Sequence, residues 1–217
     1  YLEHGNGWNN YKGLTWKATH NIRMEKVFRL FGCTKGWDTR TDTRHLKTAK
    51  RELQYIFRPK KEITDKAEAL IAGIRRNADM VVGVHIRRGD YATWNDGRFF
   101  YSLDDYHRFM LRIKDSFPDR RVAFFISSNE DIPLNIFHGC SCYRFANEPS
   151  AAVLDLYTLS ICDRITGPFS TFSRWASFIG EVPLCFLESK EQQFHDDDFS
   201  MITDYFHFEN GKEIADW

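Results

Sequence analysis

The chain has 217 residues, and its 30 Lys and Arg balance its 30 Asp and Glu, so its formal net charge is zero. It therefore lacks the basic excess of nucleic-acid coat proteins and of basic membrane-surface proteins. Hydrophobic residues make up 42% of the chain, enough to bury a core, and no apolar run approaches the ~18–20 residues of a membrane helix. We expect a globular protein with no nucleic-acid partner and no membrane span in this chain.

The chain begins at Tyr1 rather than at Met, so the lack of a leader sequence carries little weight. Its cysteines are odd in number and scattered: Cys33, Cys140, Cys142, Cys162 and Cys185. Such a set does not predict a disulfide scaffold. Because free thiols persist in reducing compartments, we expect a cytoplasmic protein. A soluble domain of the Golgi lumen stays open if the N-terminus has been trimmed.

The first 78 residues carry helical patterns and no strand pattern. Apolar residues recur at helical spacing in Asn21–Phe31 and over 44–57, after which Arg58-Pro59 is a stop signal. A third helix is expected over Thr64–Arg76, with Thr64 as its N-cap. Its apolar face consists of Ala67, Leu70, Ile71 and Ile74. Residues 1–78 are therefore expected to form a helical lead-in.

From residue 79 onward, short apolar runs alternate with helical patterns. The expected strands are Asp79–Ile86, Arg121–Ser127, Ser141–Phe145, Arg164–Thr166 and Pro183–Leu187. The expected helices are Asp104–Ser116, Ser150–Cys162 and Ser173–Ile179. Strands and helices that alternate through short connections are typical of an α/β fold, here a Rossmann-like parallel sheet flanked by helices. Ligands of such sheets bind beyond the carboxyl ends of the strands.

The sequence HIRRGDY, residues 85–91, follows the first expected strand. Strand alternation puts His85 and Arg87 on one side of the sheet. Two adjacent arginines at a strand end are costly to bury without an anion, and a guanidinium fits phosphate oxygens. The pattern indicates an anion site. The alternatives are an ordinary ion pair between Arg88 and Asp90 and an Arg-Gly-Asp adhesion tripeptide.

A second anion-binding pattern lies further along, at the start of the last expected helix. Ser170, Thr171 and Ser173 bring hydroxyl groups to the helix N-terminus, where unpaired N–H groups and the helix dipole attract anions. The alternative is that Ser170 or Thr171 merely caps the helix. Both readings can hold together, because a cap site is also an anion site.

These stretches stand in the order and spacing of a known family. HIRRGDY after an apolar strand resembles the first signature of the α-1,2-fucosyltransferase family, whose α-1,6- and protein O-fucosyltransferase relatives carry a related His-x-Arg strand end. Val153–Arg174 (VLDLYTLSICDRITGPFSTFSR) is similar to the later signature of that family, and FISSN at 125–129 fits its middle strand. Residues 36–59 fit the segment before the domain. The resemblance covers about residues 36–190.

The resemblance implies a GT-B-like fold with two Rossmann-like halves. Only about 35 residues precede the matched part here, so the N-terminal acceptor domain is expected to be reduced or missing. Residues 1–78 would be its remnant, and 79–217 the nucleotide-sugar-binding domain. The Trp-Trp pair that is usual in the later signature is Arg174-Trp175 in this chain. A partner domain or a homo-oligomer that completes the site stays open.

The activity that the resemblance implies is inverting glycosyl transfer. A sugar, expected to be L-fucose, would move from a GDP-sugar to a hydroxyl of a glycan or polysaccharide, with no metal and no other cofactor. Transfer of another nucleotide-activated sugar is one alternative. A non-catalytic nucleotide-binding or glycan-binding module derived from the fold is the other.

The resemblance also implies roles for particular residues. Arg87 would stabilise the charge that develops on the β-phosphate. Asp90 would support it and is the candidate nearest in sequence for the general base. Asp155 would accept N1–H and N2–H of guanine, its alternative being a solvated helix residue. The implied substrate-binding residues are His85, Arg88, Asp155, Ser170, Thr171, Phe172 and Ser173.

Two further patterns resemble metal sites. Asp196-Asp197-Asp198 contains the Asp-x-Asp that holds a divalent cation in another class of glycosyltransferase. It lies in a polar tail rather than at a central strand end, so a solvated acidic loop is expected. His138, Cys140 and Cys142 are soft ligands, but no second Cys or His pair completes a tetrahedral zinc site. We therefore expect no metal site.

Overall fold

The computed structural model describes residues 46–145, 151–201, 208–209 and 212–213. All of them belong to the unit that spans Leu46–Trp217. The expected helix Asn21–Phe31 lies outside the described residues. Within them, no helix combines the length and the apolar character needed to cross a membrane.

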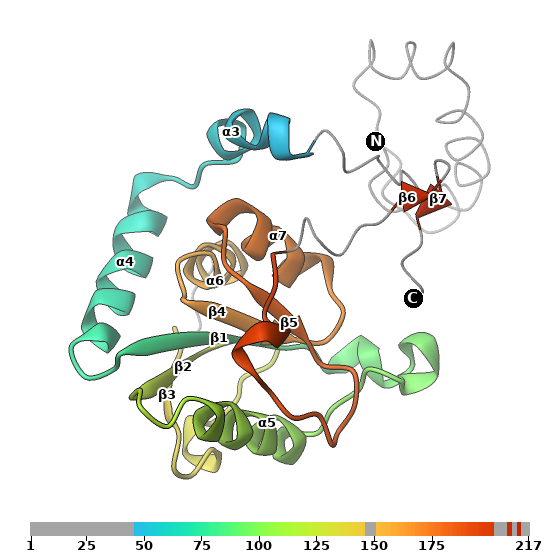
Figure 1. Cartoon of the computed structure of the whole chain (residues 1–217). Coiled ribbons are helices and arrows are strands. Elements are labelled where there is room, and N and C mark those ends of the chain that lie inside the picture. Colours follow the sequence, from blue (N-terminus) through green and yellow to red (C-terminus); the bar gives the residue numbers. More distant parts are fainter. Residues whose placement is uncertain (1–45, 146–150, 202–207, 210–211, 214–217) are drawn as a thin grey trace. The chain divides into compact units, whose positions relative to one another are not determined.

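A single five-stranded sheet forms the centre of this unit (Figure 1). The strands are β1 (Met80–Ile86), β2 (Val122–Ser128), β3 (Ser141–Tyr143), β4 (Arg164–Gly167) and β5 (Leu184–Phe186). All of them run parallel, in the spatial order β3-β2-β1-β4-β5. The Rossmann-like α/β fold expected from the sequence is thereby confirmed, and each expected strand is present within two residues of its expected bounds.

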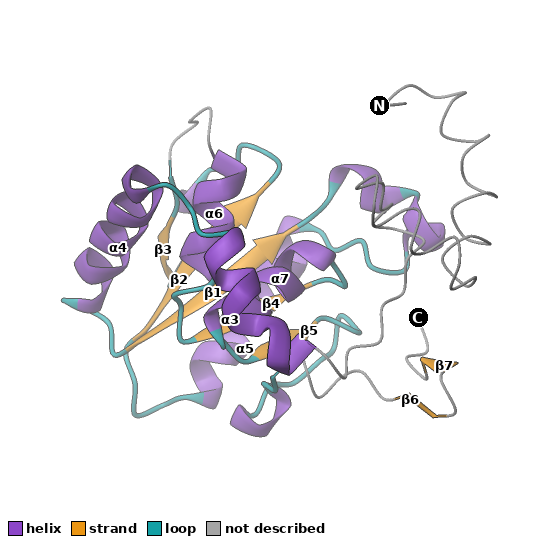
Figure 2. Ribbon diagram, turned by 90° about the horizontal axis from the view of Figure 1, so that it is seen from above, coloured by secondary structure: helices purple, strands orange, loops and turns teal. Residues whose placement is uncertain are grey.

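Helices cover both faces of the sheet (Figures 1 and 2). They are α3 (Leu46–Ile56), α4 (Lys61–Arg75), α5 (Leu103–Ser116), α6 (Ala151–Leu159) and α7 (Thr171–Gly180). One face carries α5, and the other carries α4, α6 and α7. The short strands β6 (Phe208–Glu209) and β7 (Lys212–Glu213) form a separate antiparallel pair.

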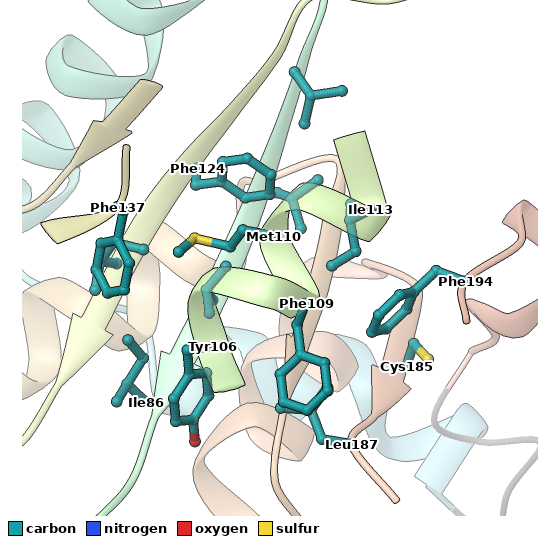
Figure 3. Close-up of a cluster of buried hydrophobic side chains, with 14 of the residues drawn as sticks. Ile86, Tyr106, Phe109, Met110, Ile113, Phe124, Phe137, Cys185, Leu187 and Phe194 are labelled. Carbon is teal, nitrogen blue, oxygen red and sulfur yellow. The ribbon is translucent and has the colours of Figure 1, made fainter. Parts of the chain in front are cut away.

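The core forms because successive residues of the central strands point to opposite faces. Ile86 and its even-numbered neighbours in β1 pack with Phe109 of α5 and Phe124 of β2, in the cluster that Figure 3 shows. Val81 packs on the other face with residues of α4 and α7. His85 shares that second face, which places it under α7 rather than under α5.

Helix α5 shows why the pattern predicted it correctly. Ser102 accepts a hydrogen bond from the Asp105 backbone, and the Asp105 carboxylate accepts one from Ser102 in return, which is a complete capping box. The four expected inward residues are all buried: Tyr106, Phe109, Met110 and Ile113. Local capping and core packing therefore agree on where this helix begins.

Two helix boundaries differ from expectation by three residues. Helix α4 begins at Lys61, and Thr64 does not cap it: the Thr64 hydroxyl lies inside the first turn and donates to the Lys61 carbonyl. Helix α6 ends at Leu159, before the expected Cys162, because the Ser160 hydroxyl donates back to Tyr157 and the chain turns there.

Helices α6 and α7 meet at a backbone contact that only glycine permits. A Cβ at Gly180 would lie 1.8 Å from the carbonyl oxygen of Ser160. The end of α7 therefore rests directly on the turn after α6.

The expected boundary between a lead-in and a nucleotide-binding domain at residue 78 stays a prediction. Helix α4, which precedes it, packs on the same face of the sheet as α6 and α7.

Candidate functional site

The candidate residues lie where three neighbouring strands end. Ile86 at the end of β1 is the register partner of Ser128 in β2, and Val84 is that of Thr166 in β4. The carboxyl ends of these parallel strands meet at one edge of the sheet, where α/β proteins bind their ligands. The loops after β1, β2 and β4 leave the sheet from this edge.

Arg87 is held by Asp90. Its Nε lies 2.9 Å from Oδ1 of Asp90, and its Nη2 lies 3.0 Å from Oδ2, the two-pronged geometry that a guanidinium and a carboxylate favour. About a third of the Arg87 side chain is exposed. The alternative of a pair between Arg88 and Asp90 is therefore wrong, because Asp90 pairs with the first arginine and leaves it at the surface.

Arg88 has a carboxylate of its own, supplied by the loop after β2. Its Nη1 lies 3.5 Å from Oε2 of Glu130, whose Oε1 accepts a hydrogen bond of 3.1 Å from the Gly89 backbone. Gly89 has φ +24°, which favours glycine there. Glu130 was not among the expected site residues, although an acidic residue just past an expected strand end was a signal for it.

His85 is buried at the end of β1. Its ring centroid lies 5.0 Å from that of Phe172, the second residue of α7. Burial and the nearby charge of Arg87 lower the pKa of His85 to about 3, so the ring is neutral at physiological pH. Its Nδ1 is buried and has no hydrogen-bond partner within the described ranges. A Cβ at Gly167 would lie 2.7 Å from the His85 carbonyl, so glycine lets β4 approach closely.

Asp155 is a buried residue of α6, which makes the alternative of a solvated helix residue wrong. Burial raises its pKa to about 6, while hydrogen bonds with the Ser127 side chain and the Ser128 backbone oppose that rise. Ser127 is the register partner of His85. Asp155 therefore lies over the end of β2, one strand from His85.

The N-terminus of α7 is capped as one of the two readings expected. Ser170 Oγ accepts a hydrogen bond of 3.2 Å from the Phe172 backbone, and the buried Ser173 hydroxyl donates to the Ser170 carbonyl. Thr171 is exposed. Arg174, in the first turns of α7, lies with its guanidinium carbon 5.4 Å from the ring centroid of Phe186. The cap leaves this helix end beside the Arg87 loop.

Tyr91, which has no role among the expected site residues, joins the loop after β1 to the loop before α7. Its hydroxyl donates a hydrogen bond of 2.5 Å to the carbonyl of Phe169, the residue before the α7 cap. The rings of His85 and Phe172 form a second contact between β1 and α7. The structure thus brings the loop after β1 and the N-terminus of α7 together, with Asp155 of α6 over the end of the adjacent strand β2.

The acidic residues of the Asp-x-Asp pattern bind groups of the protein itself. Asp196 pairs with Arg164 at 2.8 Å, and the Asp198 carboxylate accepts a hydrogen bond from the His195 backbone. Both carboxylates are thus engaged within the protein. In the part of the chain that the structure describes, no three His, Cys, Asp or Glu side chains lie close enough to share a metal ion.

A hollow of about 560 Å³ lies elsewhere, between α4 and the end of α6. Arg75, which lines it, pairs with Asp163, and Asp163 accepts a hydrogen bond from Val81 near the start of β1. The hollow is therefore at the amino edge of the sheet, away from the candidate residues. None of the residues named above for the site lines it.

The fold and this edge define an α/β protein with arginines and a helix N-terminus gathered where such sheets bind anionic ligands. The family model of glycosyl transferase family 11 matches residues 27–204, most of the chain. The chain belongs to this family. No curated protein is similar enough to the chain to count as a match.

Solved structures that are similar to part of this chain include the following three, each with a TM-score below 0.5. POFUT1 in complex with GDP has a TM-score of 0.49 and 16% identity, over 65% of this chain and 50% of that one. The fucosyltransferase NodZ from Bradyrhizobium has a TM-score of 0.46 and 18% identity, over 78% of this chain and 60% of that one. A mutant of Arabidopsis thaliana FUT1 in complex with GDP has a TM-score of 0.43 and 11% identity, over 65% of this chain and 37% of that one. The chain spans about half the length of the POFUT1 chain.

Proposed function

We propose that this chain is the donor-binding part of an inverting glycosyltransferase that moves L-fucose from GDP-fucose to a hydroxyl of a glycan or polysaccharide. The observation that carries the proposal is the pairing of the Arg87 loop with the N-terminus of α7. Tyr91 bonds to Phe169 between them, and both elements supply positive potential at the carboxyl edge. Membership of glycosyl transferase family 11 supports it.

In this proposal Arg87 binds the diphosphate and acts on the leaving group. The acceptor oxygen attacks the anomeric carbon, the bond from that carbon to the β-phosphate oxygen breaks, and its electron pair stays on GDP. Arg87 then meets more negative charge in the transition state than in the ground state, which is the condition for catalysis. Asp90 holds the guanidinium at two points, so its orientation is set before the donor binds.

The acceptor proton must go to a base. Both oxygens of Asp90 accept from Arg87, which favours a supporting role for Asp90 over that of the base. We propose that the part of the enzyme that binds the acceptor supplies the base, either from a partner domain or from a second copy of the chain. Because attack and departure occur on opposite faces of the sugar, the anomeric configuration inverts.

The guanine would be bound beside Asp155 of α6, over the end of the neighbouring strand β2. The ionised carboxylate of Asp155 can accept from N1–H and N2–H of guanine, a pair of donors that adenine does not present. His85 is neutral and buried beneath Phe172, so it lies against the nucleotide without adding a charge. Arg88, held by Glu130, together with Ser170, Thr171 and Ser173, would complete the phosphate side.

Three finer points belong to the same proposal. The HIRRGDY sequence at 85–91 favours an α-1,2 linkage among the fucosyltransferases that it resembles. Arg87 and the α7 N-terminus would carry the phosphate charge that a metal carries in other enzymes, so transfer would be independent of metal. The cytoplasmic location expected from the cysteines stays a prediction.

The proposal is tested by incubating the chain with GDP-fucose and a panel of oligosaccharide acceptors, with and without EDTA. We expect acceptor-dependent release of GDP, no effect of EDTA, and an α-1,2-linked fucose in the product by NMR. GDP binding without any transfer, with or without the acceptor-binding part supplied, would instead identify a non-catalytic binding module. Transfer only from another nucleotide sugar would replace fucose in the proposal.

A further inference from the structure

Tyr91 is anchored at both its backbone and its hydroxyl. It belongs to the 3-10 helix Gly89–Ala92, and its backbone N–H donates a hydrogen bond of 2.6 Å to the Arg88 carbonyl. Its side chain is 9% exposed, and its hydroxyl donates to the Phe169 carbonyl at 2.5 Å across 78 residues of sequence. The residue therefore fixes a long-range contact rather than a local turn.

Phe169, which accepts the hydrogen bond from Tyr91, is packed between two other aromatic rings. The ring of Phe169 stacks on that of Phe186 in β5 at 4.4 Å and meets the edge of Phe99 at 4.9 Å. Ser170, the cap of α7, follows Phe169 directly, and its side chain accepts a hydrogen bond from the Phe172 backbone. A bond to Phe169 thus holds the first residues of α7.

The Tyr91 end of this contact lies beside the Arg87 guanidinium. The Arg87 guanidinium carbon lies 6.0 Å from the centroid of the Tyr91 ring, within range of a cation–π contact. Trp94 packs against the same ring at 4.9 Å. Burial raises the pKa of the Tyr91 hydroxyl, so the hydroxyl keeps its proton and remains a donor.

We propose that Tyr91 is a positioning residue that ties the Arg87 loop to the N-terminus of α7, so that both sides of the diphosphate site form one preorganised receptor. The inference rests on the proposed function, because the ligand it positions groups for is the diphosphate of GDP. Two loops that are held together before binding lose less conformational entropy when the ligand joins them, and affinity rises accordingly.

The test is Tyr91→Phe, which removes the hydroxyl and keeps the ring. We expect the Kd for GDP to rise about tenfold, as for the loss of one good hydrogen bond, while the Kd for guanosine stays unchanged. The difference matters because guanosine lacks the diphosphate. A general loosening of the fold would weaken both ligands.

Tyr101→Phe is the matched control. The Tyr101 hydroxyl is a buried donor to the Leu187 carbonyl at 2.9 Å, and its ring lies in the core cluster under α5. Removal of the Tyr101 hydroxyl should lower the thermal stability about as much as Tyr91→Phe does, and it should leave the GDP affinity unchanged. Equal losses of GDP affinity in the two variants, or wild-type affinity in Tyr91→Phe, would overturn the inference.

Hydrogen exchange of the wild-type chain provides a second measurement that needs no variant. The tether predicts that GDP protects the amides of 87–91 and of 168–172 together, whereas protection of one segment alone would overturn it. If the wild-type chain does not bind GDP at all, the proposed function fails, and that result is distinct from either outcome for Tyr91.

Discussion

Arg87 and Arg88 are neighbours in the chain, but each is held by a carboxylate of different origin. Asp90 comes from the same turn as Arg87, three residues on, and Glu130 comes from the loop after β2. Each carboxylate fixes a guanidinium that would otherwise sample many rotamers. Because both arginines are oriented before any ligand arrives, single substitutions at this edge are informative.

Arg87→Ala should weaken GDP binding at least tenfold and abolish transfer. The variant removes a charge-assisted contact to phosphate, worth about 1.5–3 kcal/mol, and the stabilisation of the leaving group. The control is Arg121→Ala, since Arg121 holds Asp79 with the same two-pronged geometry at the opposite edge of the sheet. Both are exposed pairs, so neither variant should cost more than about 1 kcal/mol of stability. Calorimetry and thermal melting separate these effects, and equal GDP affinities in the two variants would contradict the role of Arg87.

Asp155→Asn should stabilise the fold and impair binding. The pKa of Asp155 in the folded chain, about 6, lies above its ordinary value of 3.8. The folded chain thus holds this proton more tightly than the unfolded chain, and the stabilisation is lost as pH rises from about 4 to 6. An amide cannot ionise, so the variant should gain up to about 3 kcal/mol at pH 7.5. Melting curves from pH 4 to 8 measure the gain.

The same carboxyl predicts how GDP binding depends on pH. Only the ionised form accepts from both guanine donors, so the affinity of the wild-type chain should fall as pH drops below about 6. Asp155→Asn should bind GDP weakly at every pH and lack this step. Undiminished binding of GDP by Asp155→Asn would remove Asp155 from the site.

At the scale of the elements, close backbone contacts hold α7 in place beside the sheet. The loop before α7 bonds to Tyr91, and Gly180 at its other end rests on the turn after α6. The helix N-terminus can point into the site only if the whole helix is seated. Its seating can therefore be tested far from the site.

Gly180→Ala should destabilise the chain by about 1–3 kcal/mol, because the new methyl group would enter the Ser160 carbonyl and force α6 and α7 apart. Gly73→Ala is the control: it also adds a methyl group to a helix, α4, but a Cβ there has no neighbour within 4 Å. That variant should gain about 0.5–1 kcal/mol from helix propensity. Urea denaturation measures both, and a gain in both would contradict the described contact.

The two longest strands were predictable from the sequence because each is a short, largely apolar run, as in Asp79–Ile86. The inward face of α5 was predictable because Tyr106, Phe109, Met110 and Ile113 recur at helical spacing. The partner of Asp90 was not, since it depends on how the backbone turns through Arg88 and Gly89 after the strand. Glu130 and Tyr91 were missed because their contacts join loops that are distant in sequence.

At the scale of the whole molecule, the chain belongs to a glycosyltransferase family but spans about half of the POFUT1 chain. In our proposal, the carboxyl edge supplies the groups that bind a nucleotide diphosphate. The groups for an acceptor and its base are assigned, in our proposal, to another domain or copy. Donor binding and transfer can therefore be tested separately.

GDP binding should be insensitive to EDTA. Arg87 and the α7 N-terminus are proposed to meet the phosphate charge. The carboxylates of Asp196 and Asp198 are engaged with Arg164 and with the His195 backbone. Calorimetric titration with EDTA, Mg²⁺ or Mn²⁺ checks this. A strict requirement for Mn²⁺ that disappears in Asp196→Asn would contradict it and assign the phosphate to the acidic tail.

Whether this edge binds a GDP-sugar is tested by calorimetric titration of the wild-type chain with GDP, UDP, CDP, dTDP and ADP. The arrangement of Arg87, the α7 N-terminus and Asp155 predicts one site that prefers GDP to every other nucleotide by at least tenfold, with the preference lost in Asp155→Asn. Equal binding of all five, a preference for ADP, or no binding of GDP would contradict the assignment of this edge as a GDP-sugar site.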